Sequence, residues 1–537
     1  MSGVLLESSW PRDESTAIVE LTAGTLLGRR AAEMGDRLAL VGNSHGAGTQ
    51  RRLTYRELHE EATRVARALL KHTRPGEFVA LWAPNVVEWP IIQFGAALAG
   101  VTLVALNPVL RQAELVYALN HSRSVVLIHA DRSRDYDLAA VVSAARADCP
   151  ALRRVISLSE WDRWLSDGHE DEPLLVVDPE LPAMLQYTSG TTGTPKGVLL
   201  RHRSLVNVAK LTMETAEATR GSAAVNPLPM FHTAACVIGT LGPLWLGGAV
   251  VLIEQFTPAA VLTAMRAEDA DLLFVVPTVL GAVVEAARAQ ADPPVLRTVL
   301  VGAANVPRAL IEAAETLFGA RIHNLFGQTE LAPVLAMTRR DDDHDDLVHT
   351  VGRPLPQVEC KIVDPVDGAI QPLGVAGEIC ARGHQQLIEY LHDPAATART
   401  VDAQGWVHTG DLGRMDERGM LTLTGRLKDL IIRGGENIAP AEIESCLVEH
   451  EDVLEAAVVG VPHEKWGEAV AAVVRLRAEP RDGLRSELVA HCRERLSPYK
   501  IPQLWLVAAE LPATATGKVQ KFKLVDLIIG NVLRPLT

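Results

Sequence analysis

Apolar residues in the first four hundred positions follow a helical period in some segments and form short continuous runs in others. One helical face collects Leu58, Ala62, Val65 and Leu69. Thr54 and Glu57 precede this face with the spacing of a capping box, which marks the start of a helix. Apolar runs at 78–82 and 102–106 predict strands, and the segment 86–98 between them predicts a helix. This order predicts a largely parallel sheet covered by helices.

The pattern changes near residue 351. From 351 to 423, short β-like runs alternate with Gly, Pro and Asp, which predicts a small barrel or an antiparallel sheet. A compact segment begins after Gly425, with Pro440 at the first turn of a predicted helix. A later helix has in register Leu484, Leu488, Cys492 and Leu496. We therefore predict a domain boundary near residues 425–429.

One uncharged segment, 231–253, is long enough to raise the question of a membrane span. It also contains His232, Pro243 and several glycines. These residues favour a buried helix followed by a strand, so we expect no integral membrane span.

Composition restricts the partners and the compartment of the 537-residue chain. A net charge of −14 gives no broad cationic surface for nucleic acid or anionic lipid, so a polyphosphate ligand must be bound locally. Six cysteines are scattered without metal or redox spacing, and the first residues lack a secretory pattern, which together favour the cytoplasm. We interpret the acidic run 341–346 as a solvated loop and not as a metal site.

The segment with the clearest chemistry, residues 187–198, reads YTSGTTGTPKGV. Its glycines let backbone N–H groups approach a polyphosphate, its hydroxyls add donors, and Lys196 adds a positive charge. A Walker A loop is excluded because Gly197 follows the lysine, and the flanking runs predict strand, loop, strand. The candidate nucleotide-binding residues here are Thr188, Ser189, Gly190, Thr191, Thr192, Gly193 and Lys196.

Five further segments follow in order: PLPMFHTAA from 227, NLFGQTE from 324, HTGDLG from 408, GRLKDLIIRGGENIAPAEIE from 425 and LPATATGKVQK from 511. With these segments the chain resembles, nearly end to end, the adenylate-forming (AMP-dependent synthetase and ligase) superfamily, and among its members the acyl-CoA synthetases of the fatty-acyl or aryl-CoA ligase type. The resemblance implies an α/β fold: layered α/β sheets with a small β-barrel-like subdomain over residues 1–424, a hinge at 425–428, and a small mobile α+β domain at 429–537.

The resemblance also implies residue roles at the nucleotide. Glu330 corresponds to a magnesium-associated glutamate, and a hard oxygen ligand is what Mg²⁺ requires. Thr329 is expected at the AMP phosphate. Phe326, followed by Gly327, takes the position of a tyrosine that stacks on adenine; Phe keeps the π face and loses the hydroxyl. Asp411 is expected to accept hydrogen bonds from the ribose hydroxyls.

Further roles concern the C-terminal region. By the same resemblance, Arg426 supports the ribose and Lys428 is the hinge residue about which the small domain turns between two half-reactions. Lys518 bridges the carboxylate and the α-phosphate during adenylation. Gly434 and Gly435 line the pantetheine tunnel.

The resemblance further implies that the acyl group lies beside Thr233, Ala234, Gly302 and Ala303. Small, uncharged residues there predict a pocket for a bulky hydrophobic acid. Amino-acid activators of the family usually carry an aspartate where this chain has His232, which argues against an amino-acid substrate. We count His232 with Lys518, Glu330 and Thr329 as the catalytic set.

We therefore predict an acyl-CoA ligase of fatty-acid or specialised metabolism, with Mg²⁺ as cofactor and with ATP, CoA and a small carboxylic acid as substrates. The protein is expected to be a monomer or homodimer. Two alternatives stay open: an acyl-AMP ligase that loads the phosphopantetheine of a carrier protein, and a non-catalytic nucleotide-binding regulator.

Overall fold

A computed structural model describes residues 4–46, 49–166, 173–188, 195–302, 306–433, 436–513 and 519–536. This part of the chain divides into two compact units. Unit 1 comprises residues 10–360 and 381–408, and unit 2 comprises 4–9, 361–380 and the chain from 409 onward. This division rests on compactness, which does not report where the chain bends. The predicted hinge at 425–428 and the domain limits of 1–424 and 429–537 therefore stay predictions.

Nine strands form the larger sheet of unit 1: β2 (Leu38–Asn43), β3 (Gln50–Thr54), β12 (Ala224–Asn226), β13 (Val250–Leu252), β14 (Leu272–Val275), β15 (Thr298–Gly302), β16 (Arg321–Phe326), β17 (Ala336–Met337) and β18 (Arg353–Pro354). Their order is β18-β17-β16-β15-β14-β12-β13-β2-β3. The strands from β16 to β2 run parallel, and β3, β17 and β18 pair antiparallel at the two edges.

Four helices pack on this sheet: α9 (Pro258–Ala267), α10 (Pro277–Arg288), α11 (Arg308–Phe318) and α12 (His344–His349). They share one apolar cluster with the strands, in which Met265, Val283 and Phe318 pack with Val299 and Val301. Burial of this cluster removes its apolar surface from water, which is the main favourable term for folding.

A second, seven-stranded sheet of unit 1 contains β4 (Phe78–Trp82), β5 (Thr102–Leu106), β6 (Val126–His129), β9 (Arg154–Ser157), β10 (Pro182–Thr188), β11 (Lys196–Arg201) and β21 (Glu389–Tyr390). Its order is β21-β11-β10-β5-β4-β6-β9. The strands from β10 to β9 are parallel, whereas β11 and β21 pair antiparallel.

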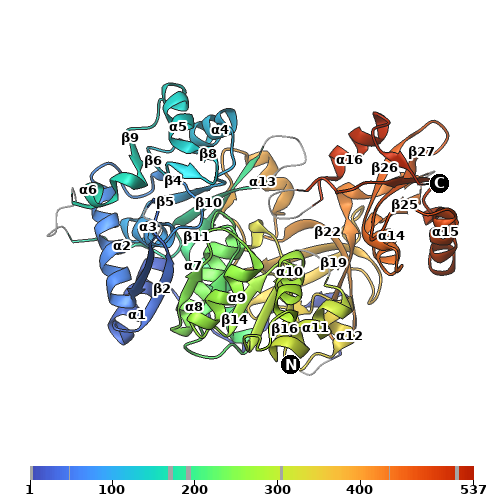
Figure 1. Cartoon of the computed structure of the whole chain (residues 1–537), viewed down its shortest axis with the longest axis horizontal. Helices are drawn as coiled ribbons and strands as arrows, with labels where there is room; N and C mark the ends of the chain where they lie inside the picture. The colour runs from blue at the N-terminus through green and yellow to red at the C-terminus, as the bar shows by residue number, and fades with distance from the viewer. Residues whose placement is uncertain are drawn as a thin grey trace. The chain divides into compact units, whose positions relative to one another are not determined.

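The remaining helices of unit 1 are α1 (Ala23–Met34), α2 (Tyr55–Leu70), α3 (Glu88–Ala99), α4 (Gln112–Ser122), α5 (Leu138–Ala145), α6 (Trp161–Ser166), α7 (His202–Thr215), α8 (Gly239–Leu246) and α13 (Pro394–Thr400). Helices α1, α2 and α3 pack on one another (Figure 1). A short hairpin joins β7 (Arg132–Ser133) to β8 (Tyr136–Asp137).

The N-terminal elements confirm the predicted strand, helix, strand order. Strands β4 and β5 have the predicted bounds, and α3 lies between them. Thr54 and Glu57 form the capping box of α2. The predicted apolar face of α2 is buried, from Leu58 to Leu69. Local periodicity is reliable for α2 because this helix has one side to bury and one to expose.

A five-stranded sheet is formed by β1 (Ser9–Trp10), β19 (Val358–Val363), β20 (Gly377–Gly383), β22 (Val407–Met415) and β23 (Leu421–Arg426), in the order β1-β19-β20-β22-β23. Strands β22 and β23 pair antiparallel. The order has two ends among the described strands, so the sheet is open. For residues 351–423 we expected a small barrel or an antiparallel sheet. The structure has an open sheet there and not a closed barrel.

The last sheet, in unit 2, contains β24 (Ile431–Arg433), β25 (Glu436–Ile438), β26 (Val453–His463), β27 (Gly467–Leu476), β28 (Leu504–Val507) and β29 (Arg534–Pro535). Alternate residues of β27 face opposite sides, so that Val470 and Ala472 join one core cluster and Ala471 and Val473 join the other. Helices α14 (Pro440–Val448) and α15 (Leu484–Arg495) cover the first side, and α16 (Lys521–Ile529) covers the second. The mixed α/β fold class is confirmed.

The uncharged segment 231–253 is internal. It contains a π-helical turn, η3 (Ala234–Ile238), then α8, then β13, and all three lie largely buried. Among the described residues, no helix combines the length and the apolar character that crossing a membrane requires. The predicted buried helix followed by a strand is confirmed.

The acidic run 341–346 is not the solvated loop that we expected. Asp343 caps α12 through the backbone N–H of Asp346 at 2.9 Å. Asp342 is buried, and it accepts hydrogen bonds from the Arg339 N–H and the Arg353 guanidinium, both at 2.6 Å. Helix capping and ion pairing explain the cluster without a metal.

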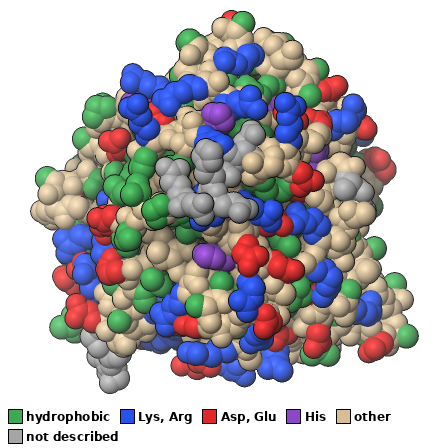
Figure 2. All heavy atoms as spheres, turned by 90° about the vertical axis from the view of Figure 1, so that its left-hand side faces the viewer, with side chains coloured by type: hydrophobic (Ala, Val, Ile, Leu, Met, Phe, Trp, Pro, Cys, Tyr) green, Lys and Arg blue, Asp and Glu red, His purple; other side chains and the backbone are tan. Residues whose placement is uncertain are grey.

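Charge is distributed in patches of both signs on the face shown in Figure 2. Basic and acidic side chains are interspersed there with scattered apolar ones. This mixed surface accords with the net charge of −14, and it differs from the continuous basic field that nucleic-acid binding needs.

Two buried histidines generate a prediction about acid stability. Burial lowers the pKa of His202 and of His323 to about 4, whereas an unfolded histidine titrates near 6.5. Between these values the unfolded chain binds protons that the folded chain does not. The contribution of these two histidines to the free energy of unfolding is therefore complete above pH 6.5. It is lost as the pH falls from 6.5 toward 4, at ~1.4 kcal/mol per pH unit for each group.

Thermal unfolding at pH 7.0 and 5.0 measures this effect. The melting temperature should drop over this interval in the native protein, and it should drop less in His323→Gln. Equal drops in the two proteins would contradict the histidine explanation.

Candidate active site

The carboxyl ends of β12, β14, β15 and β16 lie at one edge of the nine-stranded sheet, because these strands are parallel neighbours. Ligands of open α/β sheets bind outside this edge. The segment that contains His232 follows β12, Gly302 ends β15, and Phe326 ends β16. The topology therefore brings three of the predicted motifs to the same edge.

The turn after β16 depends on Gly327. A Cβ atom on this residue would lie 1.9 Å from the Pro333 carbonyl oxygen, so only glycine fits the close approach. Thr329 and Glu330 then form a 3₁₀ turn, η4 (Thr329–Leu331). The Leu387 N–H donates to the Glu330 carbonyl at 2.8 Å, which fixes the backbone of the candidate metal ligand.

The candidate phosphate loop joins β10 to β11, which pair antiparallel with Thr188 opposite Lys196. The predicted strand, loop, strand is confirmed for the flanks. Helix α4 holds both ends: Tyr117 donates to the Pro195 carbonyl at 3.0 Å, and Tyr187 donates to the Ala118 carbonyl at 2.9 Å. The predicted residues Ser189, Gly190, Thr191, Thr192 and Gly193 lie outside the described residues.

Tyr390 connects Lys196 with Glu330. Its phenol donates to Glu330 Oε1 at 2.7 Å, and the Lys196 Nζ lies 4.7 Å from the centre of its ring. Burial, reinforced by the Glu330 carboxylate, raises the pKa of Tyr390, so the phenol stays protonated as a donor. Sequence reasoning missed Tyr390, because it lies in a short strand far along the chain from both partners and belongs to none of the recognised motifs.

Asp411 and Arg426 form an ion pair in unit 2. They lie opposite each other on β22 and β23, with 2.7 Å between Arg426 Nε and Asp411 Oδ1, and the Asp411 side chain is buried. Lys428 follows in the turn η5 (Leu427–Asp429), where burial and Arg426 lower its pKa. The structure therefore brings the predicted ribose residues and the predicted hinge residue together.

The candidate acyl segment carries no charge at neutral pH. Burial lowers the pKa of His232 to about 4, which keeps the ring neutral, and the ring packs on Phe231 with centres 4.3 Å apart. Thr233 is buried and Ala234 is partly exposed, while Ala235 lies fully inside. Gly302 ends its strand, but Ala303 lies outside the described residues, as do Gly434, Gly435 and Lys518.

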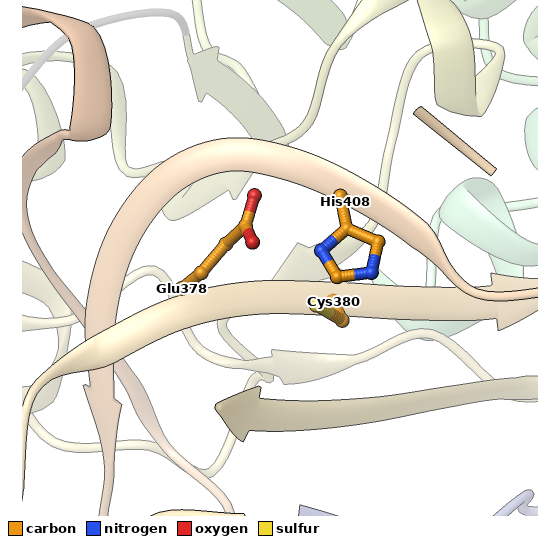
Figure 3. Close-up of side chains that lie close together, drawn as sticks. All are labelled: Glu378, Cys380 and His408. Carbon is orange, nitrogen blue, oxygen red and sulfur yellow. The ribbon is translucent and has the colours of Figure 1, made fainter. Parts of the chain in front are cut away.

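A group of possible metal donors on β20 and β22, Glu378, Cys380 and His408, is shown in Figure 3. Glu378 Oε1 accepts the Gly410 N–H at 3.0 Å, and His408 Nε2 lies 3.6 Å from the Asp402 carboxylate. These interactions account for the positions of the Glu378 carboxylate and the His408 ring without an ion. We therefore assign no metal to this group.

Comparison with known proteins decides the family. Residues 27–391 match the AMP-binding enzyme family, and residues 442–518 match the AMP-binding enzyme C-terminal domain. The chain belongs to the AMP-binding enzyme family.

Relatives of this AMP-binding enzyme cover nearly its whole length. A CoA ligase of Rhodococcus jostii, named for a (7a-methyl-1,5-dioxo-octahydro-1H-inden-4-yl)propanoyl group, is 35% identical over 93% of this chain and 97% of its own. The mitochondrial medium-chain acyl-CoA ligase ACSF2 of Bos taurus is 31% identical over 94% of this chain and 87% of its own. The crystal structure of the anthranilate CoA ligase AuaEII with anthranoyl-AMP matches with a TM-score of 0.86 and 25% identity, over 96% of this chain and 99% of that one.

These comparisons identify the kind of enzyme. The protein is an adenylate-forming acid–thiol ligase of the acyl-CoA synthetase type, and ATP, CoA and a small carboxylic acid are the substrates that fit its family. The alternative of a non-catalytic nucleotide-binding regulator is not retained.

Proposed function

We propose that this ligase activates a bulky hydrophobic carboxylic acid as its acyl-AMP and then transfers the acyl group to CoA. The observation that carries the proposal is the neutral acyl segment at the carboxyl edge of the nine-stranded sheet, with His232 uncharged and Ala234 small and partly exposed. An uncharged wall disfavours an ammonium or a second carboxylate and favours apolar surface. The groups named in the relatives, a bicyclic propanoyl, a medium chain and an anthranoyl, support this substrate class.

In the first half-reaction, a substrate carboxylate oxygen attacks the α-phosphorus of ATP, and pyrophosphate leaves. We assign phosphate binding to Thr188, the loop after it, Lys196 and Thr329. Lys518 is the group that we expect to neutralise the developing charge. The Glu330 carboxylate fits Mg²⁺ because its Oε1 accepts the Tyr390 O–H, which leaves the group a carboxylate, and carboxylate oxygens are hard ligands of the type that the ion prefers. Bound Mg²⁺ would offset charge on the phosphates.

We assign adenine stacking to Phe326, beside Gly327, and ribose binding to Asp411, whose carboxylate Arg426 orients at 2.7 Å. Lys428 is the proposed hinge, and Gly434 and Gly435 the proposed lining of the pantetheine tunnel. In the second half-reaction the thiol attacks the acyl carbonyl, the thioester forms, and AMP leaves.

CoA is favoured over a carrier protein by an exposed aromatic and basic group on unit 2. Trp466 is 40% exposed, with the Arg433 guanidinium 5.6 Å and the Lys465 ammonium 4.8 Å from its ring centres. Tyr499, also exposed, accepts a hydrogen bond from Arg433 through its carbonyl at 2.7 Å. An exposed aromatic ring with two neighbouring cations suits the adenine and the phosphates of CoA, whereas a carrier-bound phosphopantetheine lacks the adenosine and keeps a single phosphodiester.

Loading of a carrier protein is the second candidate because the same thiol chemistry serves it. A cytoplasmic location and a monomeric or homodimeric state complete the proposal.

The substrate class is tested by ATP–pyrophosphate exchange with a series of carboxylic acids. We expect kcat/KM to rise with apolar size, because each buried CH₂ contributes ~0.8 kcal/mol, and acetate to be a poor substrate. Ala234→Trp should lower kcat/KM for the largest acids about tenfold while the KM for ATP stays unchanged. If acetate or propionate gives the highest kcat/KM in the native enzyme, the large hydrophobic pocket is wrong.

The acceptor is tested with Trp466→Ala. Loss of stacking, at about 1–3 kcal/mol, should raise the KM for CoA about tenfold and leave pyrophosphate exchange unchanged. Turnover with pantetheine, which lacks the nucleotide, should be unaffected. The matched control is Phe522→Ala, which removes another exposed aromatic with a neighbouring lysine in the same unit. An equal loss with CoA and pantetheine, or a preference for a holo-carrier protein, argues against this assignment.

A further inference from the structure

We propose that Tyr390 is a positioning residue that keeps the Glu330 carboxylate and the Lys196 ammonium apart and aimed at the metal and the phosphates. The inference rests on the proposed function, because that function assigns Glu330 to Mg²⁺ and Lys196 to ATP. It adds a residue that none of the recognised motifs contains.

Tyr390 contacts both charges with different parts of one side chain. The phenol O–H donates to Glu330 Oε1 at 2.7 Å, and the Lys196 Nζ lies 4.7 Å from the ring centre. The first contact stabilises a carboxylate without removing its negative charge. The second stabilises an ammonium without removing its positive charge.

The backbone around Tyr390 is fixed to both partners. Strand β21 pairs with β11, which begins at Lys196, and the Leu391 N–H donates to the Gly197 carbonyl at 2.8 Å. The Leu387 N–H donates to the Glu330 carbonyl, also at 2.8 Å. Segment 387–391 therefore joins the phosphate-loop strand to the turn that carries Glu330.

The physical reason for such a spacer is the opposite charge of its two partners. A lysine and a glutamate in direct contact form an ion pair, and each then has less charge to offer another ligand. Tyr390 instead gives each charge a neutral contact, its O–H for Glu330 and its ring for Lys196. Glu330 thereby keeps its charge for a divalent cation, and Lys196 keeps its charge for phosphate.

Two substitutions separate the contacts. Tyr390→Phe removes the O–H donor and retains the ring as a spacer, whereas Tyr390→Leu removes both. The matched control is Tyr136→Phe, because Tyr136 also donates its phenol, to the Leu110 carbonyl at 3.0 Å, and also lies beside a cation, Arg111, at 4.6 Å. Melting temperatures of all variants report any general loss of folding.

The decisive readout is the affinity of the enzyme for Mn²⁺, a spectroscopic substitute for Mg²⁺, measured by electron paramagnetic resonance with a non-hydrolysable ATP analogue. Loss of a hydrogen-bonding partner of a metal ligand costs about 10–100-fold in affinity. We expect a Kd about tenfold higher in Tyr390→Phe, a larger increase in Tyr390→Leu, and no change in Tyr136→Phe. The Mg²⁺ concentration that half-saturates pyrophosphate exchange should rise in the same order.

A Glu330→Gln variant keeps the two proposals distinguishable. If it raises the Kd for Mn²⁺ and neither Tyr390 variant does, the positioning role is overturned and the role of Glu330 stands. If Glu330→Gln also leaves the Kd unchanged, the assignment of Glu330 to the metal fails, and the role of Tyr390 fails with it.

Discussion

The antiparallel pairing of β10 with β11 is the interaction on which the candidate site depends. A chain with a net charge of −14 must concentrate cationic and N–H groups at one place to hold a polyphosphate. Because β10 also pairs in parallel with β5, the loop is anchored in a buried sheet instead of on a free hairpin. Tyr117 and Tyr187 fix its two ends to α4, and β21 pairs with the outer side of β11, which brings Tyr390 beside Lys196.

Sequence predicted those parts of the fold whose determinants are local. The buried face of α2 follows from periodicity and capping, the bounds of β4 and β5 follow from continuous apolar runs, and the helix that begins at Pro440 follows from a fixed proline φ. Motif residues such as Glu330 and Asp411 were recognised by resemblance. Their surroundings were not, because a motif specifies a residue type and a spacing but not the side chains that arrive from elsewhere in the chain.

What sequence missed depends on distant contacts. The role proposed for Tyr390 depends on its hydrogen bond to Glu330, which lies 60 positions earlier. The group around Trp466 contains residues from three separate segments. Asp342 looks like solvated surface in a run of aspartates, yet Arg339 and Arg353 bury and pair it. Likewise, nothing in the letters AACVI distinguishes the partly exposed Ala234 from its buried neighbours in a π-helical turn.

In the proposed reaction, a carboxylate oxygen of the substrate becomes bonded to the α-phosphorus of ATP before the thioester forms. Turnover of an ¹⁸O-labelled carboxylic acid with ATP and CoA tests it directly by mass spectrometry of the products. An acyl-AMP intermediate predicts one ¹⁸O atom in AMP and unlabelled pyrophosphate, because the oxygen that attacks phosphorus stays on AMP when the thiol displaces it. Unlabelled AMP, or ADP formed together with labelled inorganic phosphate, would contradict an acyl-AMP intermediate.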